Sequence, residues 1–446
     1  MRAAMSSFAM AFIVALFFCG MAAAYIASGF AEGLFAGAGR LTNILFLSLV
    51  FVMVMAVALT VAERKWSALM QDRIGPNRAR IALPWFRGHS LGGLPHVLAD
   101  TFKMLSKEAF VPATASRFLF NLAPVLSFAA IFALFAVVPA GPTLPVHNHR
   151  VSMVIATPDF GLLYIFAIAS LAVYGTSLAG WASNNKLALL GGVRASSQMI
   201  SYEVALGLSL VGMMIAFDTV RLATDPVTGA LGMTDAQARY LWTFGSDFGL
   251  PAWGIFLQPV GFVLFFAAAF AETKRAPFDL PEAESEILGY FVEYSGMQFG
   301  LFMIGEFVEV VILAGIITAI FFGGYHLPFG EATLARWDLF RQHPWVWGAF
   351  LGTVFWVKAL FIVWIQLLMR WTFPRFRYDQ VQRLGWKMLL PAGLLNLFVS
   401  GALILWDPSL RALAVVGLFE IGVVIAFTFT SKPAVAARPA AAAAHH

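Results

Sequence analysis

The sequence has little cysteine and little charge. Its only cysteine, Cys19, excludes a disulfide framework and any cluster held by several thiolates of this chain. Charged residues make up 12% of the 446 residues and hydrophobic residues 60%, against about 25% and about 45–50% in soluble domains. A soluble protein cannot cover so much apolar side chain. We therefore identify an integral membrane protein, and we attribute the net charge of +5 to loops beside a bilayer rather than to a nucleic-acid site.

The apolar runs also lack histidine. The eight histidines are His89, His96, His147, His149, His326, His343, His445 and His446. A haem between membrane helices usually takes histidine ligands inside the spans, so a haem protein is not expected. We interpret His147 and His149 as a solvated loop pair rather than a metal site. Since we find no P-loop, dinucleotide fingerprint, zinc-protease motif or nucleophile elbow, we expect no cofactor or metal on this chain.

Ten apolar runs are long enough to cross a bilayer, which takes about 20 residues. They lie at 8–28, 41–62, 118–139, 160–182, 197–217, 253–271, 299–323, 347–369, 386–405 and 410–430. Each run is continuously apolar and lacks the alternation of a barrel strand. The predicted fold is an all-α polytopic membrane bundle. Lys and Arg are concentrated in alternate loops, which predicts that loops 63–117 and 272–298 face the cytoplasm.

The two ends of the chain are less defined. Run 8–28 follows Arg2 and ends in small residues, as a cleaved signal peptide does, but it is long for one. We favour a retained helix and leave the cleaved signal open. The segment 433–446 is rich in Ala and Pro and is expected to be disordered.

Five charged residues fall inside predicted spans and away from their first and last residues: Glu203, Glu306, Glu309, Lys358 and Glu420. A charge at the centre of a span costs roughly 2.5–3.5 kcal/mol, so each is a candidate for function. Glu306 and Glu309 lie on one helical face, where both cannot easily be ionised. A paired structural charge explains any one of them, and Glu420 could face a partner subunit. Glu203, Glu306 and Lys358 together favour a buried path for protons or ions.

The loop after run 253–271 is dense in acids: Glu272, Asp279, Glu282, Glu284, Glu286 and Glu293. Asp279 and Glu282 resemble a capping box at the start of a helix. Capping does not explain the other acids, and Glu282 and Glu286 repel each other at i,i+4. We expect the protein to use them.

The loop after run 41–62 is basic and contains a short amphipathic segment. Leu94, Val97, Leu98, Phe102, Leu105 and Ala109 mark one face, and His96, Asp100, Lys103 and Lys107 mark the other. At about 15 residues the segment is too short to span, so it is predicted to lie at the membrane interface. It either anchors the loop or roofs a cavity through which an amphiphilic molecule enters.

Seven stretches in these loops together resemble one family. They are Glu63-Arg64-Lys65 through Gly75-Pro76-Asn77, Ala99-Asp100 through Lys107-Glu108, 180–186, Arg194-Ala195 through Ser201-Tyr202-Glu203, Ala271-Glu272-Thr273 through Glu286, Val292-Glu293-Tyr294, and 374–380. From about residue 41 to 405 they resemble the quinone-channel subunit of respiratory complex I, which is the H subunit of bacterial NADH–quinone oxidoreductase and chain 1 in mitochondria.

The resemblance implies an organisation. A domain 41–405 has eight transmembrane helices, which match the second to ninth predicted spans. Residues 1–40 and 406–432 are then extra membrane segments, and 433–446 is a tail. The implied location is the bacterial inner membrane, with the long charged loops in the cytoplasm.

The resemblance also implies a function. Proteins of this family carry no redox group and are not catalytic alone, but they form a tunnel that admits quinone to the terminal iron–sulfur cluster and couple quinone reduction to proton translocation. FMN and iron–sulfur clusters belong to partner subunits. The implied partners are peripheral-arm subunits on the cytoplasmic loops, small membrane-arm subunits at the sides, membrane lipid and quinone, with no nucleic acid.

Individual residues match family positions. Those around the quinone channel are Arg64, Asp100, Lys103, Arg275, Phe278 and Asp279, and those of the acidic proton-coupling chain are Glu203, Glu282, Glu284, Glu286, Glu293 and Glu306. Lys274 departs from the pattern because an amide is usual there, and Glu309 is an additional acid. Two alternatives stay open: the equivalent subunit of a membrane-bound hydrogenase or dehydrogenase with another electron donor, and a free-standing cation/proton transporter.

Overall fold

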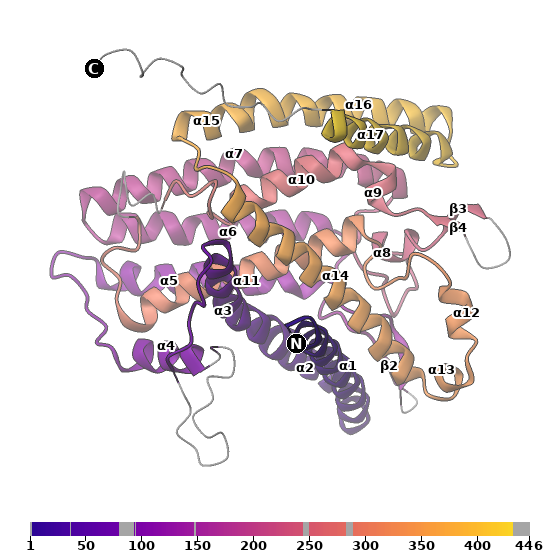
Figure 1. Ribbon diagram of the computed structural model, residues 1–446, viewed down its shortest axis with the longest axis horizontal. Coiled ribbons are helices and arrows are strands. Elements are labelled where there is room, and N and C mark those ends of the chain that lie inside the picture. The colour runs from indigo at the N-terminus through magenta and orange to yellow at the C-terminus, as the bar shows by residue number, and fades with distance from the viewer. Residues whose placement is uncertain are drawn as a thin grey trace, which may run out of the picture.

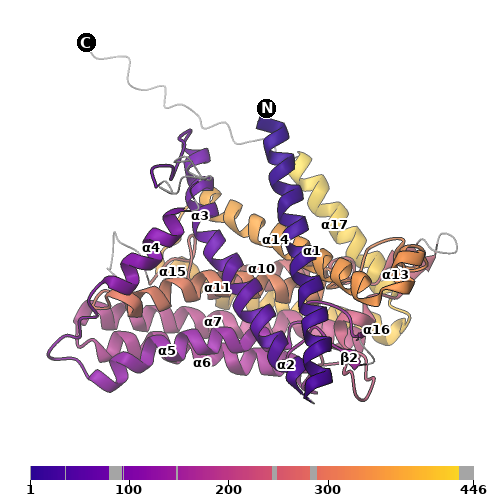
Figure 2. The ribbon, with the colours of Figure 1, turned by 90° about the horizontal axis from the view of Figure 1, so that it is seen from below.

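The computed structural model describes residues 2–35, 37–79, 93, 95–146, 149–243, 249–281 and 289–430. These residues are predominantly helical, with two short antiparallel hairpins (Figures 1 and 2). The helical elements are α1 (Arg2–Leu34), α2 (Ala38–Asn43), η1 (Ile44–Val52), α3 (Met53–Met70), α4 (Pro95–Ser106), α5 (Arg117–Leu134), η3 (Phe135–Val137), α6 (Gly161–Ala182), α7 (Lys186–Phe217), α8 (Met233–Ala236), α9 (Gly254–Leu257), α10 (Pro259–Glu272), α11 (Gly296–Phe321), α12 (Glu331–Ala335), α13 (Asp338–Gln342), α14 (Pro344–Thr372), α15 (Tyr378–Arg383), η4 (Leu384–Leu389), α16 (Leu390–Trp406) and α17 (Arg411–Thr430). Strand β1 (Leu144–Val146) pairs with β2 (His149–Val151), and β3 (Tyr240–Thr243) pairs with β4 (Gly249–Pro251). The all-α membrane fold is confirmed.

Nine helices in the described part of the chain are long and apolar enough to cross a membrane. The predicted run 253–271 is not one continuous helix. The helix is interrupted at Gln258, between α9 and the short apolar helix α10. Pro259 opens α10, and a proline cannot continue the preceding helix because it lacks an N–H. The predicted run 197–217 lies in a helix that begins earlier, at Lys186, because the side chain of Asn185 accepts a hydrogen bond from the Leu187 N–H at 2.9 Å.

Helix α11 is the centre of the bundle and is buried along almost its whole length. It packs against α5, α14 and α3, and Figure 1 shows α14 crossing it diagonally. Glu306 and Glu309 lie on this helix and are both buried. The acids predicted from the sequence therefore project from the least exposed helix of the molecule.

Helix α1 is built into the same core. Met21 and Tyr25 are fully buried, and the Tyr25 hydroxyl donates to the Pro142 carbonyl at 2.7 Å. The ring of Phe17 stacks on Trp356 of α14, with centroids 6.2 Å apart. Truncating a buried aromatic side chain costs about 3–5 kcal/mol, so these contacts favour a retained helix over a cleaved signal. The division into a core and two extra terminal segments stays a prediction.

The amphipathic segment predicted in the basic loop is present as α4. Its apolar side chains Leu98, Phe102 and Leu105 are more than half exposed, and only Pro95 is buried. Exposed apolar residues at this spacing fit a helix that lies against lipid. Its position at the membrane interface stays a prediction.

Lys358 has a structural partner at the end of α11. Its Nζ donates to the carbonyls of Phe322, Gly324 and His326 at 2.8, 2.9 and 2.5 Å. The C-terminal carbonyls of a helix lack partners within the helix and carry partial negative charge, so a lysine stabilises them. Lys358 therefore binds the C-cap of α11 at Phe322 and the turn that follows it, which the sequence alone did not indicate.

Glu420 of α17 meets the break between α9 and α10. Its carboxylate accepts a hydrogen bond from the backbone N–H of Val260, in the first turn of α10. Gly417 lets α17 approach closely, because a Cβ there would collide with the carbonyl of Phe256. Glu420 thus satisfies a free helix N-terminus within this chain.

Candidate functional site

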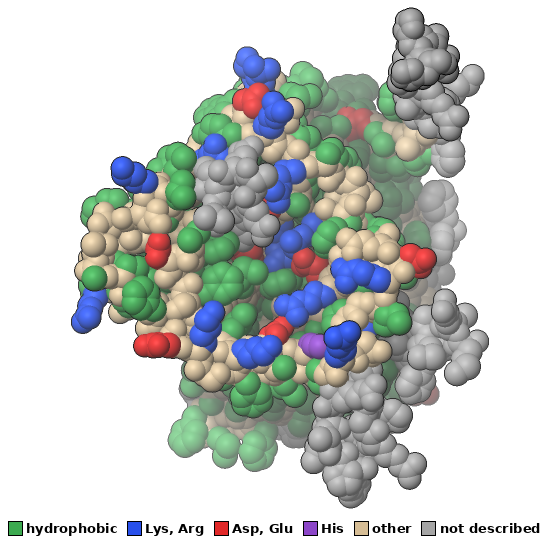
Figure 3. Space-filling view, turned by 60° about the vertical axis from the view of Figure 1, so that its left-hand side comes forward, with side chains coloured by type: hydrophobic (Ala, Val, Ile, Leu, Met, Phe, Trp, Pro, Cys, Tyr) green, Lys and Arg blue, Asp and Glu red, His purple; other side chains and the backbone are tan. Residues whose placement is uncertain are grey.

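The end of the bundle that carries α4, the start of α7 and the loop 273–281 is here called the basic face. Figure 3 shows Lys and Arg side chains spread over it around hydrophobic ones. Loop 273–281 is held against α7 by Gln198, whose Nε2 donates to the carbonyls of Ala271 and Phe278 at 2.6 and 2.8 Å. This loop places Arg275 toward the interior of the face.

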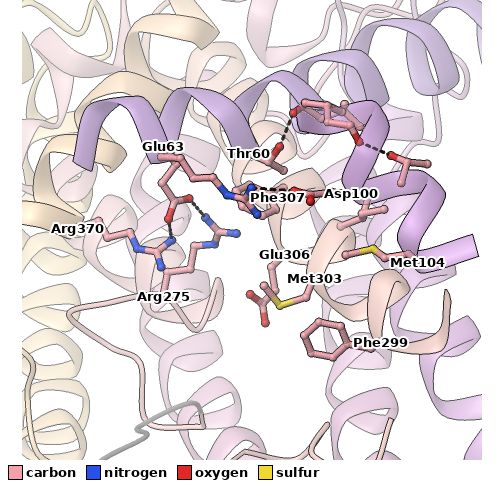
Figure 4. A pocket seen from close by; sticks show the side chains of 15 residues that line it. Thr60, Glu63, Asp100, Met104, Arg275, Phe299, Met303, Glu306, Phe307 and Arg370 are labelled. Atoms are coloured by element: carbon pink, nitrogen blue, oxygen red, sulfur yellow. Dashed lines mark hydrogen bonds and ion pairs between the residues drawn. The ribbon is translucent and has the colours of Figure 1, made fainter. Parts of the chain in front are cut away.

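Glu63 joins three elements behind the basic face. Its Oε2 accepts from Arg275 Nη1 at 2.7 Å, and its Oε1 pairs with Arg370 of α14. The Arg275 guanidinium also lies over the Phe307 ring, 3.8 Å from its centroid. Glu63 and Arg275 are both buried, and Figure 4 shows the two arginines converging on one carboxylate. Sequence reasoning placed Glu63 in a motif but gave it no role.

A cavity of about 300 Å³ lies beside this cluster (Figure 4). Its apolar lining residues are Val57, Val97, Met104, Phe299, Met303, Ile304 and Phe307, and its polar lining residues are Thr60, Glu63, Arg64, Asp100, Thr101, Arg275, Glu306 and Arg370. A second cavity of about 700 Å³ shares Arg64, Asp100, Met104 and Phe299 with it and continues past Lys103 toward Tyr294. A lining that combines apolar and charged side chains suits an amphiphilic molecule.

Arg64 and Asp100 stand at the rim where the two cavities meet. Arg64 Nη1 donates to Asp100 Oδ2 at 2.7 Å, which links α3 to α4. Both side chains are exposed, 56% and 36%, so the pair contributes at most about 1 kcal/mol. We infer that the rim can open at little cost, unlike the buried cluster around Glu63.

The predicted channel residues divide into two groups. Arg64, Asp100, Lys103 and Arg275 line the two cavities. The other two, Phe278 and Asp279, lie in the adjoining loop: Phe278 packs against Phe376 with ring centroids 5.5 Å apart, and Asp279 accepts from Arg375 at 2.7 Å. The structure therefore gives these two residues loop contacts rather than a place in the cavity walls.

The predicted acidic chain is only partly described. Glu306 lines the first cavity. Glu203 lies half-buried on α7, and Glu293 accepts from Asn185 Nδ2 at 2.6 Å. Glu282, Glu284 and Glu286 lie outside the described residues.

Two further acids were not assigned from the sequence. Glu272 and Glu309 are buried, and they interact electrostatically with each other. Glu272 also interacts with Glu203. The acids of this region are therefore the buried Glu306, Glu309 and Glu272 and the half-buried Glu203 on α7. The sequence feature that could have identified Glu272 is its place in the Ala-Glu-Thr motif.

The opposite face has a separate charged cluster. His326 Nε2 lies 2.9 Å from Asp235 Oδ1, and its Nδ1 lies 3.1 Å from Glu331 Oε1. Both ring nitrogens face carboxylates, so both must donate and the ring is protonated. Burial alone lowers the pKa of His326, but the hydrogen bonds and charges of the two acids outweigh it and raise the pKa to about 9.

This cluster predicts a pH dependence. The folded-state pKa of His326 lies above its ordinary value of 6.5, so the stabilisation is complete below pH 6.5 and is lost as pH rises through about 9. The loss is at most about 3 kcal/mol, at 1.36 kcal/mol per pKa unit. Hydrogen exchange of the complex, corrected for intrinsic rates, should show protection of segment 322–331 falling between pH 7 and 9.5. His326→Gln should already be low at pH 7 and nearly flat, and a wild-type profile as flat as the variant's would contradict the interpretation.

In the described ranges no group of three or more His, Cys, Asp or Glu side chains could hold a metal ion. The basic face thus contains a buried cation–carboxylate cluster, several carboxylates behind it and two cavities that share lining residues.

Comparisons with known proteins add the following findings. A family model described as NADH dehydrogenase matches residues 42–401. The NADH-quinone oxidoreductase H subunit 1 of Cytophaga hutchinsonii is 39% identical over 355 residues, which cover 79% of this chain and 93% of that protein. The corresponding H subunit 2 of Syntrophobacter fumaroxidans is 40% identical over 372 residues, which cover 83% and 98%. The H subunit 1 of Geobacter metallireducens is 41% identical over 358 residues, which cover 80% and 94%.

Proposed function

The chain belongs to the NADH dehydrogenase family, as a membrane subunit of NADH-quinone oxidoreductase, and from this premise we propose that it forms the quinone-access channel of the complex and passes the effect of quinone reduction to proton translocation. The observation that carries the proposal is the 300 Å³ cavity between α3, α4 and α11, whose lining combines apolar and charged side chains. In this proposal the chain has no redox group of its own and is not catalytic alone.

The cavity walls suit a quinone. Its apolar tail would follow the side lined by Met104, Phe299 and Met303, and its polar head would reach Arg275 and Glu306. The exposed apolar face of α4 supplies a route along lipid to the rim. The ion pair between Arg64 and Asp100 at the rim is exposed. Separating these two side chains to admit the quinone would therefore not break a buried ion pair.

The buried carboxylates suit proton coupling. Reduction of a quinone by two electrons takes up two protons, which changes the charge next to Glu306. Glu272 and Glu203 would receive this change in sequence because carboxylates interact strongly where water is excluded. On the resemblance alone, we extend the same role to Glu293 and to the acids outside the described residues, which are Glu282, Glu284 and Glu286.

The basic face is proposed to be cytoplasmic, in a bacterial inner membrane. Its Lys and Arg side chains follow the positive-inside rule (Figure 3). Subunits that carry FMN and iron–sulfur clusters would dock on this face, and small membrane subunits would contact the sides. Electron donor and quinone type depend on those partners.

Photoaffinity labelling tests the channel. A photoactivatable quinone analogue added to the complex in its native membrane should label segments 95–106 and 296–307, because these line the cavity. Excess unlabelled quinone should suppress this labelling. The lipid-exposed helix α16 is the matched control, since any labelling there should not be suppressed. Labelling of the two segments that unlabelled quinone does not reduce would contradict the proposal, as would isolation of the chain with a hydrogenase.

A further inference from the structure

Lys274 and Glu309 are buried charged residues that line neither of the two cavities described above. They lie 35 residues apart in sequence, on the loop after α10 and on α11. The structure brings them together: Lys274 Nζ lies 4.0 Å from Glu309 Oε2. Their exposures are 1% and 3%, so neither charge reaches bulk solvent.

The backbone at Lys274 does not favour a lysine. Its φ of 56° lies in the left-handed region, which Gly and Asn adopt more easily than residues with long side chains. Burial of the ammonium adds a further cost. A lysine kept here needs a partner, and among the described residues Glu309 is the acid within ion-pair distance.

Glu309, in turn, needs a cationic partner. Within the described part of the chain, its Oε2 accepts no hydrogen bond. The cations acting on its carboxylate are Lys274 and Arg275, and Arg275 is already bonded to Glu63. Of these two cations, Arg275 is hydrogen-bonded to another acid, Glu63. Among the described residues, Lys274 is the one that is not bonded to another acid in this way.

The surroundings of the pair are charged on several elements. They comprise Glu306 on α11, Arg275 on loop 273–281, Glu272 on α10, Glu203 on α7, Glu63 on α3 and Arg370 on α14. Glu309 lies one helical turn from Glu306 and interacts with Glu272. An ionised Glu309 without a counter-ion would add repulsion to this run of acids.

We propose that Lys274 and Glu309 act as one charge-compensated unit, in which Lys274 positions an additional carboxylate between Glu306 and Glu272. The pairing itself does not depend on the function proposed above, whereas the role of the additional carboxylate in coupling rests on it. Both are positioning residues, since neither lines the quinone cavity.

A double-mutant cycle in the complete complex tests the pairing. Lys274→Asn removes the cation at ion-pair distance from Glu309, and Glu309→Gln removes the acid paired with the buried lysine. Each single variant should lower the amount of assembled complex in membranes at least three-fold, and Lys274→Asn/Glu309→Gln should return it to within two-fold of wild type. Wild-type assembly in both single variants, or losses that multiply in the double variant, would overturn the pairing.

A matched control and a second readout separate pairing from simple packing. Lys274→Asn combined with Glu108→Gln, an exposed acid, should show multiplied effects rather than rescue. The acid limb of the pH profile of quinone reduction should move to higher pH in Lys274→Asn, to lower pH in Glu309→Gln, and back in the double variant. Rescue of assembly with unmoved pH profiles would keep the ion pair and overturn its part in coupling.

Discussion

Replacing Glu63 with alanine is expected to reduce the assembled complex in membranes by at least ten-fold. The change leaves the buried Arg275 and the partly buried Arg370 without the carboxylate that joins them. Removing one partner from a buried charge cluster costs roughly 3–5 kcal/mol, which is a large part of the stability of a domain. Native gel electrophoresis of solubilised membranes, with immunodetection of this chain, measures the outcome.

The matched control for Glu63→Ala is Asp100→Ala. Asp100 also pairs with one arginine, at the same 2.7 Å, but the pair is exposed at the rim. We expect its loss to change assembly by less than about two-fold, because an exposed ion pair is worth roughly 0–1 kcal/mol. Equal losses in the two variants would mean that burial does not set the weight of these pairs, and the account of the Glu63 cluster would then be wrong.

Replacing Met303 with tryptophan is expected to lower quinone reduction by at least ten-fold while the complex still assembles. Met303 lies in the wall of the 300 Å³ cavity, and an indole there would fill space that the quinone needs. Oxidation of NADH with a water-soluble artificial acceptor should be kept, because it does not require the membrane cavity. The two rates, measured on the same membranes, give the result.

Val263→Trp on α10 is the control for Met303→Trp. Val263 is 60% exposed, so the added ring would point into lipid and leave the cavity unchanged. Its quinone reductase rate should stay within two-fold of wild type. Undiminished activity in Met303→Trp, with normal assembly, would show that quinone does not pass this wall.

The spans could be predicted because hydropathy is a local property. Each long helix covers an apolar run of the sequence, and α4 follows from the spacing of its apolar residues. The break at Gln258 was not predicted, since the mean hydropathy of the run 253–271 is high despite Gln258; the signal for the break was Pro259, which follows it. The early start of α7 depends on one side-chain cap at Asn185, which a hydropathy window does not detect.

The site was harder to predict because its contacts join distant segments. Glu63 and Arg275 are 212 residues apart, and no local pattern connects them. Glu306 was identified correctly as a buried acid, since a carboxylate in an apolar run is conspicuous. The same reasoning grouped Lys358 with a proton path, yet its ammonium is bound to three carbonyls at the end of α11. Depth in the membrane alone does not distinguish a cap from a relay.

The contact between Glu420 and Val260 gives helix α17 a structural role in the bundle. A backbone amide left facing hydrocarbon costs several kcal/mol, and α10 starts with such an amide where no preceding turn can serve it. A chain shortened after residue 405 would lose the carboxylate that this amide faces. Helix α17 therefore covers the polar start of α10 in the wall of the bundle.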